Sequence, residues 1–399
     1  MNLERKGQSP FYPGQPVPVE LFVGRAREIA RIRRAAVQVA GGKPQSTFIC
    51  GEYGIGKSSL ARYMRAVTEE DPGLLGFHVM LGASDSLNDL AAATVHTMAS
   101  SNAAKPKATE TIRKILSDYI GEISLLGVIT LKLDKLRKDA PDISREYLPF
   151  LHKVYDQIKG EYQGIMLILD EINGIVGKPV FAQFLKNLVD ENALSNRPLP
   201  LLLALCGTEE RYKEIVDRHR PVERIFDIAR IDPMNEAEMK EFFNLTFGKA
   251  GMKVDDEAMY YLCLFSGGLP KLMHLVGDSA FWIAQEDVID KDTAFDAIIA
   301  AAEDVGRKYV DQQVYKALRS KDYKRILSKL AKHDFDLSFK KNEVVKGLNE
   351  DEKRKFNNFL QKMKKLGVLN SGEERGEYIF RDRLTRLYIR METISRRGG

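Results

Sequence analysis

The sequence predicts an α/β fold, in which a parallel β-sheet core is followed by a helical segment and a basic C-terminal domain. Two continuous apolar runs, at residues 164–169 and 201–205, are typical of strands that are buried on both faces of a parallel sheet. A glycine-rich loop at residues 51–58 stands between a short apolar strand and a run of helix-forming residues. Positive charge is concentrated toward the C-terminus. Residues 307–399 hold 25 lysines and arginines against 13 aspartates and glutamates, whereas the net charge of the whole chain is only +5. A basic tail on a mildly acidic body indicates an anionic partner for the tail.

The composition narrows the class of protein. A length of 399 residues with 44% hydrophobic residues predicts two or three globular domains and excludes a disordered, collagen-like or coiled-coil chain. No apolar run approaches the roughly 18 residues of a membrane-spanning helix, and no apolar signal region follows the first residues, so we expect a soluble cytoplasmic protein without a membrane partner. The three cysteines are widely spaced in apolar surroundings and the histidines form no ligand pair, which leaves magnesium as the only expected metal.

The loop at residues 51–58 has the spacing G-x4-G-K-S, and it follows an expected strand at residues 46–50. Glycines allow the backbone to wrap closely around phosphate groups, while main-chain N–H groups and the helix N-terminus supply positive potential. Lys57 adds a positive charge toward the outer phosphates, and Ser58 is placed to ligate magnesium. The residues predicted to contact a nucleotide here are Gly51, Gly54, Ile55, Gly56, Lys57, Ser58 and Ser59.

The apolar run at residues 164–169 ends in two carboxylates, Asp170 and Glu171. Because parallel strands present their carboxyl ends at one edge of the sheet, we expect this pair beside the glycine-rich loop. Asp170 is predicted to hold magnesium together with Ser58. Glu171 is predicted to accept a proton from the water that attacks the γ-phosphate of ATP.

Thr208 follows the second apolar run and would lie at the same edge of the sheet. Its hydroxyl would orient either the attacking water or an oxygen of the γ-phosphate. An equally good interpretation is that Thr208 caps the helix that starts at Glu209.

Taken in order, these elements resemble the AAA+ ATPases: a phosphate-binding loop, a hydrophobic strand that ends in Asp-Glu, a strand that ends at Thr208, an arginine-rich helix and a helical segment. From about residue 9 onward, the chain is most similar to the archaeal and bacterial branch that groups with the origin-recognition initiators, and it shares features with STAND signalling ATPases. The resemblance implies a P-loop AAA+ core with a helical lid, ATP and Mg²⁺ as cofactors, hydrolysis of ATP to ADP and phosphate, and self-association into a ring or filament.

Two further sets of residues take their roles from this resemblance. Phe22 and Val23 resemble the AAA+ segment that packs on adenine before the first helix, and the alternative is an ordinary hydrophobic staple ahead of that helix. An arginine from the neighbouring subunit usually completes an AAA+ site by neutralising charge on the transferred phosphoryl group. Arg224 fits that position best and Arg220 second, and a solvated basic helix face is the alternative for either.

The segment at residues 266–271 departs from the initiator pattern. Initiator-type AAA+ proteins carry Gly-Asp-x-Arg here, and the arginine touches the γ-phosphate, whereas this sequence has Pro270 at that place and Lys271 next. The Gly-x-Pro form is more similar to STAND ATPases. Lys271 offers a single positive charge where an arginine would offer a fork of donors, and we predict that it senses the nucleotide.

From residue 321 onward the sequence predicts three short helices and a hairpin, an order that resembles a winged helix. Apolar residues recur at helical spacing in the expected third helix, residues 350–366, and leave its basic residues mostly exposed. These would neutralise DNA phosphates, and Arg375 at the hairpin tip would enter a minor groove. A solvated helix face or a protein-binding winged helix is the alternative. The predicted DNA-contacting residues are Lys353, Arg354, Lys355, Lys362, Lys364, Lys365 and Arg375. A last helix around residues 384–388 is expected to pack on this domain.

The predicted domains are an N-terminal linker and adenine-pocket segment (1–24), a nucleotide-binding domain (25–232) with an insertion at about 102–147, a helical lid (233–306) and a basic winged-helix domain (307–399). The insertion would face a protein partner or a ring's central pore, or it is a plain surface elaboration. The predicted function is that of an oligomer-forming ATPase that acts on or at DNA, with ATP binding and hydrolysis switching its assembly state. A STAND-like signalling switch is the alternative, as is a transposition or defence-system regulator that partner proteins load on DNA.

Overall fold

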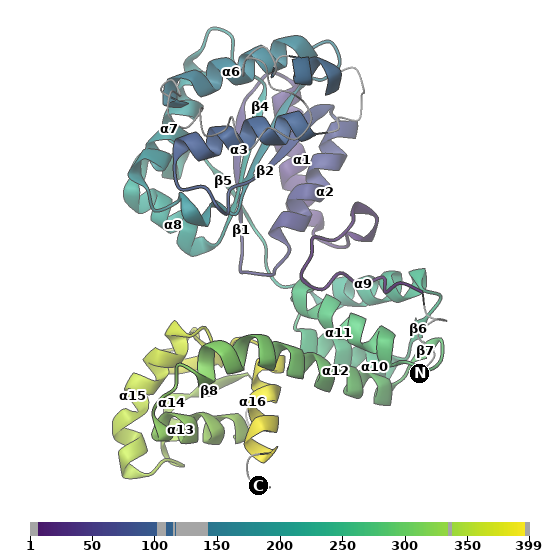
Figure 1. Cartoon of the computed structure of the whole chain (residues 1–399), viewed down its shortest axis with the longest axis vertical. Helices are drawn as coiled ribbons and strands as arrows, with labels where there is room; N and C mark the ends of the chain where they lie inside the picture. The colour runs from purple at the N-terminus through teal and green to yellow at the C-terminus, as the bar shows by residue number, and fades with distance from the viewer. Residues whose placement is uncertain (1–6, 102–108, 115, 117–142, 334–336, 396–399) are drawn as a thin grey trace. The chain divides into compact units, whose positions relative to one another are not determined.

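The computed structural model describes residues 7–101, 109–114, 116, 143–333 and 337–395, which form two compact units. The first runs from Pro16 to Asp232 and contains a five-stranded β-sheet, so we call it the sheet unit. The second combines residues 1–15 with residues 233–399 and consists mainly of helices, so we call it the helical unit. The elements of both units are labelled in Figure 1.

The sheet unit is built on five parallel strands in the order β2-β3-β4-β1-β5. Every residue of β3 and β4 is buried, as expected for continuous apolar strands that are covered on both faces. The edge strand β5 begins at Asp227, shortly after a 3-10 helix that ends at Arg224. The α/β fold with a parallel sheet core is therefore confirmed. The strands are β1 (Gln45–Cys50), β2 (Leu74–Met80), β3 (Gly164–Asp170), β4 (Leu201–Gly207) and β5 (Asp227–Arg230).

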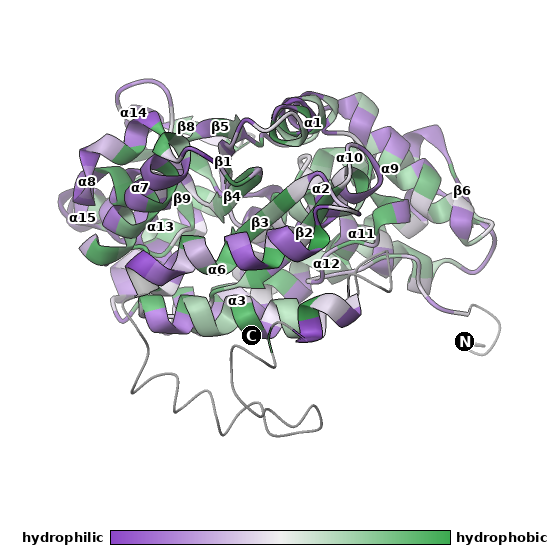
Figure 2. Ribbon diagram, turned by 90° about the horizontal axis from the view of Figure 1, so that it is seen from above, coloured by the Kyte–Doolittle hydropathy of each residue, from purple (hydrophilic) through white to green (hydrophobic). Residues whose placement is uncertain are grey.

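Helices cover both faces of this sheet. Two lie on one face and four on the other, where they pack against one another in chain order (Figure 1). Phe77, Leu167 and Leu203 come from three neighbouring strands and join Phe184 of a covering helix in one buried core. Figure 2 shows hydrophilic and hydrophobic residues alternating along α3 and α6, as in helices with one apolar face. The first pair is α1 (Ala26–Ala40) and α2 (Lys57–Glu70), and the other four are α3 (Leu87–Ser100), α6 (Ile143–Ile158), α7 (Pro179–Leu194) and α8 (Glu209–Arg218). Short 3-10 helices are η2 (Val19–Leu21), η3 (Ile172–Gly174) and η4 (Arg220–Arg224).

The predicted lid forms the first part of the helical unit. A segment near the N-terminus packs on it: the ring of Phe11 lies 4.7 Å from that of Phe247 and 6.2 Å from that of His274. Gly277 makes this packing possible, because a β-carbon there would lie 2.2 Å from the Phe11 ring. The elements are α9 (Glu236–Lys249), β6 (Lys253–Val254), α10 (Asp256–Ser266), α11 (Pro270–Ile283), β7 (Val288–Ile289) and α12 (Lys291–Val305).

The C-terminal part contains the helices and the hairpin that the sequence predicts, and also a short strand, β8, that it does not. Three strands form an antiparallel sheet in the order β8-β10-β9. The last helix packs on α13, as expected, and on α12 as well, where Gly306 leaves room for the ring of Tyr388. The elements are η5 (Gly306–Tyr315, π-helical), α13 (Lys321–Lys332), β8 (Ser338–Lys340), α14 (Lys341–Val345), α15 (Glu350–Lys365), β9 (Leu369–Ser371), β10 (Glu377–Phe380) and α16 (Arg383–Ser395).

Most of the predicted insertion, including its expected strand at residues 129–133, lies outside the described residues. Residues 109–114 are helical, and Ile112 and Leu116 join the core of the sheet unit together with Tyr147 of α6. None of the described helices is long and apolar enough to cross a membrane.

Candidate functional site

The glycine-rich sequence forms a tight loop between β1 and α2. Gly54 and Gly56 have φ angles of 84° and 99°, in the left-handed region where other residues are strained. Gly56 directly precedes α2, so the first turn of that helix opens onto the loop. Such a helix N-terminus presents unpaired N–H groups and partial positive charge, which suit a phosphate. The amide of Gly51 donates to the carbonyl of Gly207 at 3.2 Å and joins the loop to the end of β4.

Lys57 is the first residue of α2, and its side chain folds back over the loop. Nζ donates to the carbonyl oxygens of Gly51 at 3.0 Å and of Glu52 at 2.8 Å. Burial lowers the pKa of the Lys57 ammonium below its ordinary value, while the nearby acidic groups Cys206 and Asp170 oppose the shift. The positive side chain is thus held against the main chain of the loop.

Asp170 ends β3 beside this loop and is only 2% exposed. Its Oδ2 lies 2.9 Å from Nε2 of His78, the main-chain N–H of Glu171 donates to its Oδ1 at 2.8 Å, and the hydroxyl of Ser58 also hydrogen-bonds to it. Burial alone would raise the pKa of Asp170, but the hydrogen bonds from His78 and Ser58 outweigh burial and bring the pKa below its usual value. The carboxylate is therefore ionised.

Glu171 lies at the same edge of the sheet but is exposed. Its φ of 55° is in the left-handed region, which few residues other than glycine adopt. Its carboxylate lies against Gly82, where a β-carbon would come within 2.5 Å of Oε2. Asp170 is buried and Glu171 is exposed, so the two neighbouring carboxylates stand in different environments.

Ser58 and Asp170 fit a magnesium ion. Mg²⁺ takes oxygen ligands and is usually held by one or two carboxylates together with substrate phosphates and water. The Ser58 hydroxyl already touches an ionised carboxylate, next to a loop shaped for phosphate. In the part of the chain that the structure describes, no group of three or more His, Cys, Asp or Glu side chains could hold a metal.

The other residues predicted around the phosphates have more ordinary surroundings. Thr208 caps α8, since its hydroxyl accepts a hydrogen bond from the amide of Arg211 at 3.4 Å. The structure thus shows the capping role, and the water-orienting role stays a prediction. Arg220 and Arg224 are exposed in η4, and their side chains bond to none of the described residues.

The predicted adenine segment lies beside α2. The ring of Phe22 stacks on that of Tyr63, with 4.5 Å between centroids, and Val23 is buried. Ser59 in the first turn of α2 accepts a hydrogen bond from the amide of Val17 at 3.3 Å. The structure therefore brings residues 17–23 against the helix that follows the loop.

The sequence analysis assigns no role to two residues that lie near the loop. His78 contacts Asp170 from β2, a strand that the sequence analysis did not predict. A signal was present, because a single histidine interrupts the apolar run Leu74–Met80. The guanidinium of Arg25 donates to the carbonyl of Ile55 within the loop at 3.1 Å and to the carbonyl of Asp232. No local sequence signal indicates these contacts, because they join distant parts of the chain.

Lys271 lies at the start of α11 in the helical unit. Burial, followed by the charge of Arg381, lowers the pKa of its ammonium. Its predicted contact with a nucleotide would join the two units and stays a prediction.

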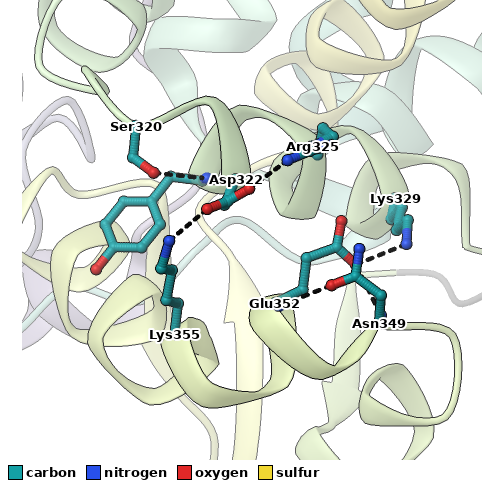
Figure 3. Close-up of polar contacts among 8 residues, drawn as sticks. Ser320, Asp322, Arg325, Lys329, Asn349, Glu352 and Lys355 are labelled. Carbon is teal, nitrogen blue, oxygen red and sulfur yellow. Dashed lines mark hydrogen bonds and ion pairs between the residues drawn. The ribbon is translucent and has the colours of Figure 1, made fainter.

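The basic residues of α15 are partly paired within the C-terminal part (Figure 3). Lys355 and Arg325 both bind the carboxylate of Asp322 on α13. Lys329 donates to the buried Glu352 at 2.6 Å, and Glu352 exchanges capping hydrogen bonds with Asn349 (Figure 3). These contacts tie α13 to α15.

The seven residues predicted to contact DNA therefore fall into two groups. Lys353 pairs with Glu350 at 2.8 Å, Arg354 lies 3.8 Å from Asp351, Lys355 binds Asp322, and Lys364 donates to Ser371 at 2.6 Å. The side chains of the other three have no hydrogen bond or ion pair to any described residue, and these residues lie at the C-terminal end of α15 and in the β9–β10 turn. They are Lys362, Lys365 and Arg375.

Comparisons with known proteins agree with this geometry. Residues 21–215 match the sequence model of the AAA ATPase domain. No curated protein matches the chain. Among solved structures, the Walker-type ATPase PABY2304 of Pyrococcus abyssi is similar over 92% of this chain and 96% of its own, with 16% identity and a TM-score of 0.57. The ORC2 protein of Aeropyrum pernix, in its ADPNP–ADP complexes, is similar over 98% of this chain and 97% of its own, with 12% identity and a TM-score of 0.56.

At these identities the structural neighbours establish the fold. The sequence match covers the glycine-rich loop, Asp170 and Glu171, which the structure brings to one edge of the sheet. Residues 21–215 of this chain are similar to the AAA ATPase domain, and the sheet unit that contains them has an α/β fold with a parallel sheet core.

Proposed function

We propose that the chain is a magnesium-dependent ATPase of the AAA+ class. The observation that supports this most strongly is the ionised Asp170 in contact with Ser58 beside the phosphate loop, with Glu171 next to it. ADPNP and ADP in the Aeropyrum pernix ORC2 structure favour an adenine nucleotide. Phe22 and Val23 would contact the adenine, and the loop amides with Lys57 would hold the phosphates.

The chemistry follows from the placement of these side chains. Bound magnesium would neutralise charge on the phosphate oxygens, held by Ser58 and Asp170. Glu171 is exposed at the sheet edge and accepts a proton from the water that attacks the γ-phosphate. The bond between the γ-phosphorus and the oxygen that bridges it to the β-phosphate breaks. ADP and phosphate then leave, and the proton passes from Glu171 to solvent. Lys57 stabilises the charge that develops on the outer phosphates.

The direct test is phosphate release by the full chain supplied with ATP and Mg²⁺, with and without duplex DNA. We expect release that stops when EDTA is added in excess. Arg27→Ala serves as a matched control, because this exposed arginine on α1 bonds to none of the described residues. Absence of release from the wild-type protein under every condition would contradict the proposal.

We further propose that the active site is completed by a second copy of the chain, in a ring or filament that forms with ATP. Arg220 and Arg224 support this, because both are exposed beside β5 with no bond to the described residues. Substituting Arg224→Ala is expected to leave ATP binding unchanged and to slow hydrolysis about 1,000-fold, the smaller end of the effect of such an arginine. Sedimentation with ATP and with ADP measures the assembly, and a monomer in both states would contradict this proposal.

The C-terminal part is proposed to act on DNA as a winged helix, residues 307–399. Its element order and three-stranded sheet support this fold, and the unpaired Lys362, Lys365 and Arg375 offer positive charge to phosphates. Duplex binding by the full chain is expected to weaken steeply with salt. The triple alanine variant at these positions should lower the slope of log K against log salt by about two to three. Binding that is absent at every salt concentration, with and without ATP, would contradict it.

One observation favours a second candidate, a STAND-like switch in which the C-terminal part is an internal clamp. Helix α16 packs on α12 of the lid as well as on α13, and Tyr388 of α16 donates to Asp311 at 2.8 Å. A clamp predicts that ATP exposes this contact to proteases and that duplex DNA does not bind. The same contact makes substitutions in the full chain preferable to a truncation at Gly306, which would uncover α12.

A further inference from the structure

Arg25 occupies an unusual place beside the phosphate loop. It is 5% exposed, and its φ of 64° lies in the left-handed region. Among the described residues other than glycine, only Arg25 and Glu171 have such a backbone. A bulky residue in this region is strained and keeps that backbone only where its surroundings hold it there, and such residues gather at functional sites.

The side chain of Arg25 bridges two segments that are far apart in sequence. One terminal nitrogen donates to the carbonyl oxygen of Ile55, inside the phosphate loop, at 3.1 Å. The other donates to the carbonyl oxygen of Asp232, the last residue of the sheet unit. A guanidinium can hold two acceptors at fixed positions because its donors form a rigid fork.

The segment that Arg25 holds is the one that leaves the sheet unit. Ile231 donates its amide to the carbonyl of Cys50 at 2.7 Å, and a β-carbon on Gly51 would lie 3.0 Å from the carbonyl of Ile231. Residues 231–232 therefore lie against the start of the phosphate loop. Pro233 follows directly and begins the helical unit.

The second connection between the units is bound to the same helix start. Residues 1–15 belong to the helical unit and Pro16 begins the sheet unit. The amide of Val17, one residue later, donates to the hydroxyl of Ser59 in the first turn of α2 at 3.3 Å. Both chain connections thus begin at main-chain groups that are hydrogen-bonded to the loop or to its helix.

We infer that Arg25 is a positioning residue that couples the phosphate loop to the connection at residues 231–233. Nucleotide binding orders the loop, the carbonyl of Ile55 moves with it, and the guanidinium transmits this change to Asp232. The inference rests on the proposed nucleotide site and adds to it the route by which an occupied site reaches the helical unit. Because Arg25 binds carbonyl oxygens and not the reacting groups, it acts on the chemistry only through the loop.

Hydrogen exchange of the full chain, with and without Mg·ADP, tests this inference. In the wild-type protein ADP is expected to slow exchange both in residues 51–58 and in residues 227–232. In Arg25→Ala, ADP should still slow exchange in residues 51–58, but residues 227–232 should no longer respond. The alanine keeps a β-carbon at the same backbone position, so the variant removes the guanidinium without relieving the backbone. A response of residues 227–232 that equals the wild-type response would overturn the inference.

Two further variants keep the test decisive. Arg25→Lys supplies one ammonium in place of the fork, so we expect a folded protein that binds ADP and has lost the response at residues 227–232. Arg27→Ala removes an exposed arginine from the same helix and should behave as wild type.

A comparison without nucleotide separates this inference from the proposed function. In the nucleotide-free state, Arg25→Ala is expected to speed exchange in residues 227–232 about tenfold, because a charged hydrogen bond to their carbonyl is lost. Unchanged exchange there would overturn the coupling role. If ADP fails to slow exchange at residues 51–58 of the wild-type protein, the proposed nucleotide site fails, and this nucleotide-free comparison still decides whether Arg25 holds the connection.

Discussion

The edge of the sheet and helix α15 both gather charged residues, but they use them in opposite ways. At the sheet edge one buried carboxylate, Asp170, receives hydrogen bonds from Ser58, His78 and the amide of Glu171. On α15 the charges are spread along the helix, and several are paired with their own neighbours at the surface. Exposed pairs of this kind contribute about 0–1 kcal/mol each, whereas breaking a buried pair is far more costly. A nucleotide site can therefore be recognised from residues at a fixed spacing, whereas the number of positive charges alone does not identify a DNA-binding surface.

The largest effect is expected at the phosphate loop. Substituting Lys57→Ala should abolish nucleotide binding, because each charged hydrogen bond to a phosphate contributes about 1.5–3 kcal/mol and this lysine is aimed into the loop. A fluorescent ATP analogue titrated against both proteins measures the change. Lys365→Ala on α15 is the matched control and should bind the analogue as wild type does, since it lies in the other unit. Equal loss in both variants would contradict the role of Lys57 in holding the phosphates.

The second effect concerns His274, a buried histidine of the helical unit. Burial lowers the pKa of His274 to about 4, and its Nδ1 accepts a hydrogen bond from the amide of Tyr12 at 3.2 Å, so the ring is neutral in the folded protein. An unfolded histidine has a pKa near 6.5, so between these two values the unfolded chain binds more protons. The contribution of this ring to stability is therefore complete above about pH 6.5 and is lost as the pH falls toward 4. The expected loss is about 3 kcal/mol, because each unit of pKa shift corresponds to about 1.36 kcal/mol.

Urea unfolding at pH 7 and at pH 4.5 measures this loss. In His274→Gln the part of the loss that comes from this ring should disappear, because glutamine does not titrate. The same pH dependence in the wild-type protein and the variant would show that other groups cause it.

The contrast between the two regions also explains what the sequence could predict. The loop at residues 51–58 and the pair Asp170 and Glu171 lie in short, local patterns, and their strand and helix context follows from adjacent residues. The structure placed them together as the parallel topology requires. The fold class could be predicted for the same reason.

Contacts that join distant segments could not be predicted in this way. His78 of β2 contacts Asp170 of β3, and Arg25 contacts Asp232, which lies far from it in the sequence. Strand β8 has three residues, of which one, Phe339, is buried, so no periodicity marks it. The pairing of Lys355 with Asp322 depends on how α13 and α15 pack, which composition does not determine.

The third effect tests whether His78 positions Asp170. In His78→Ala the carboxylate loses one hydrogen bond, so about tenfold more Mg²⁺ should be needed for the same binding of ADP, as for other residues that orient a metal ligand. Binding of Mn²⁺ with ADP, followed by electron paramagnetic resonance, gives a reading that does not depend on hydrolysis. His78→Asn, which retains a donor, should restore part of the affinity. An unchanged metal requirement in His78→Ala would make the contact purely structural.

The smallest effect separates the two groups of basic residues on α15. Lys355→Ala removes an exposed ion pair with Asp322 and is expected to lower the free energy of unfolding only slightly, with little change in DNA binding. Lys365→Ala removes an unpaired charge, so it should leave stability unchanged and reduce the salt dependence of DNA binding by about one unit of slope. Thermal unfolding and a salt titration on both variants would show whether the assignments are reversed.

We propose that the sheet edge is a hydrolytic site in which Glu171 acts on water and Asp170 acts on magnesium. ATP binding and single-turnover hydrolysis, measured on the same preparation of Glu171→Gln, separate these two roles. We expect binding within about twofold of wild type and hydrolysis slower by at least about 100-fold, since a general base contributes on the order of 10²–10⁴. Hydrolysis at the wild-type rate, or loss of binding in parallel with hydrolysis, would contradict it.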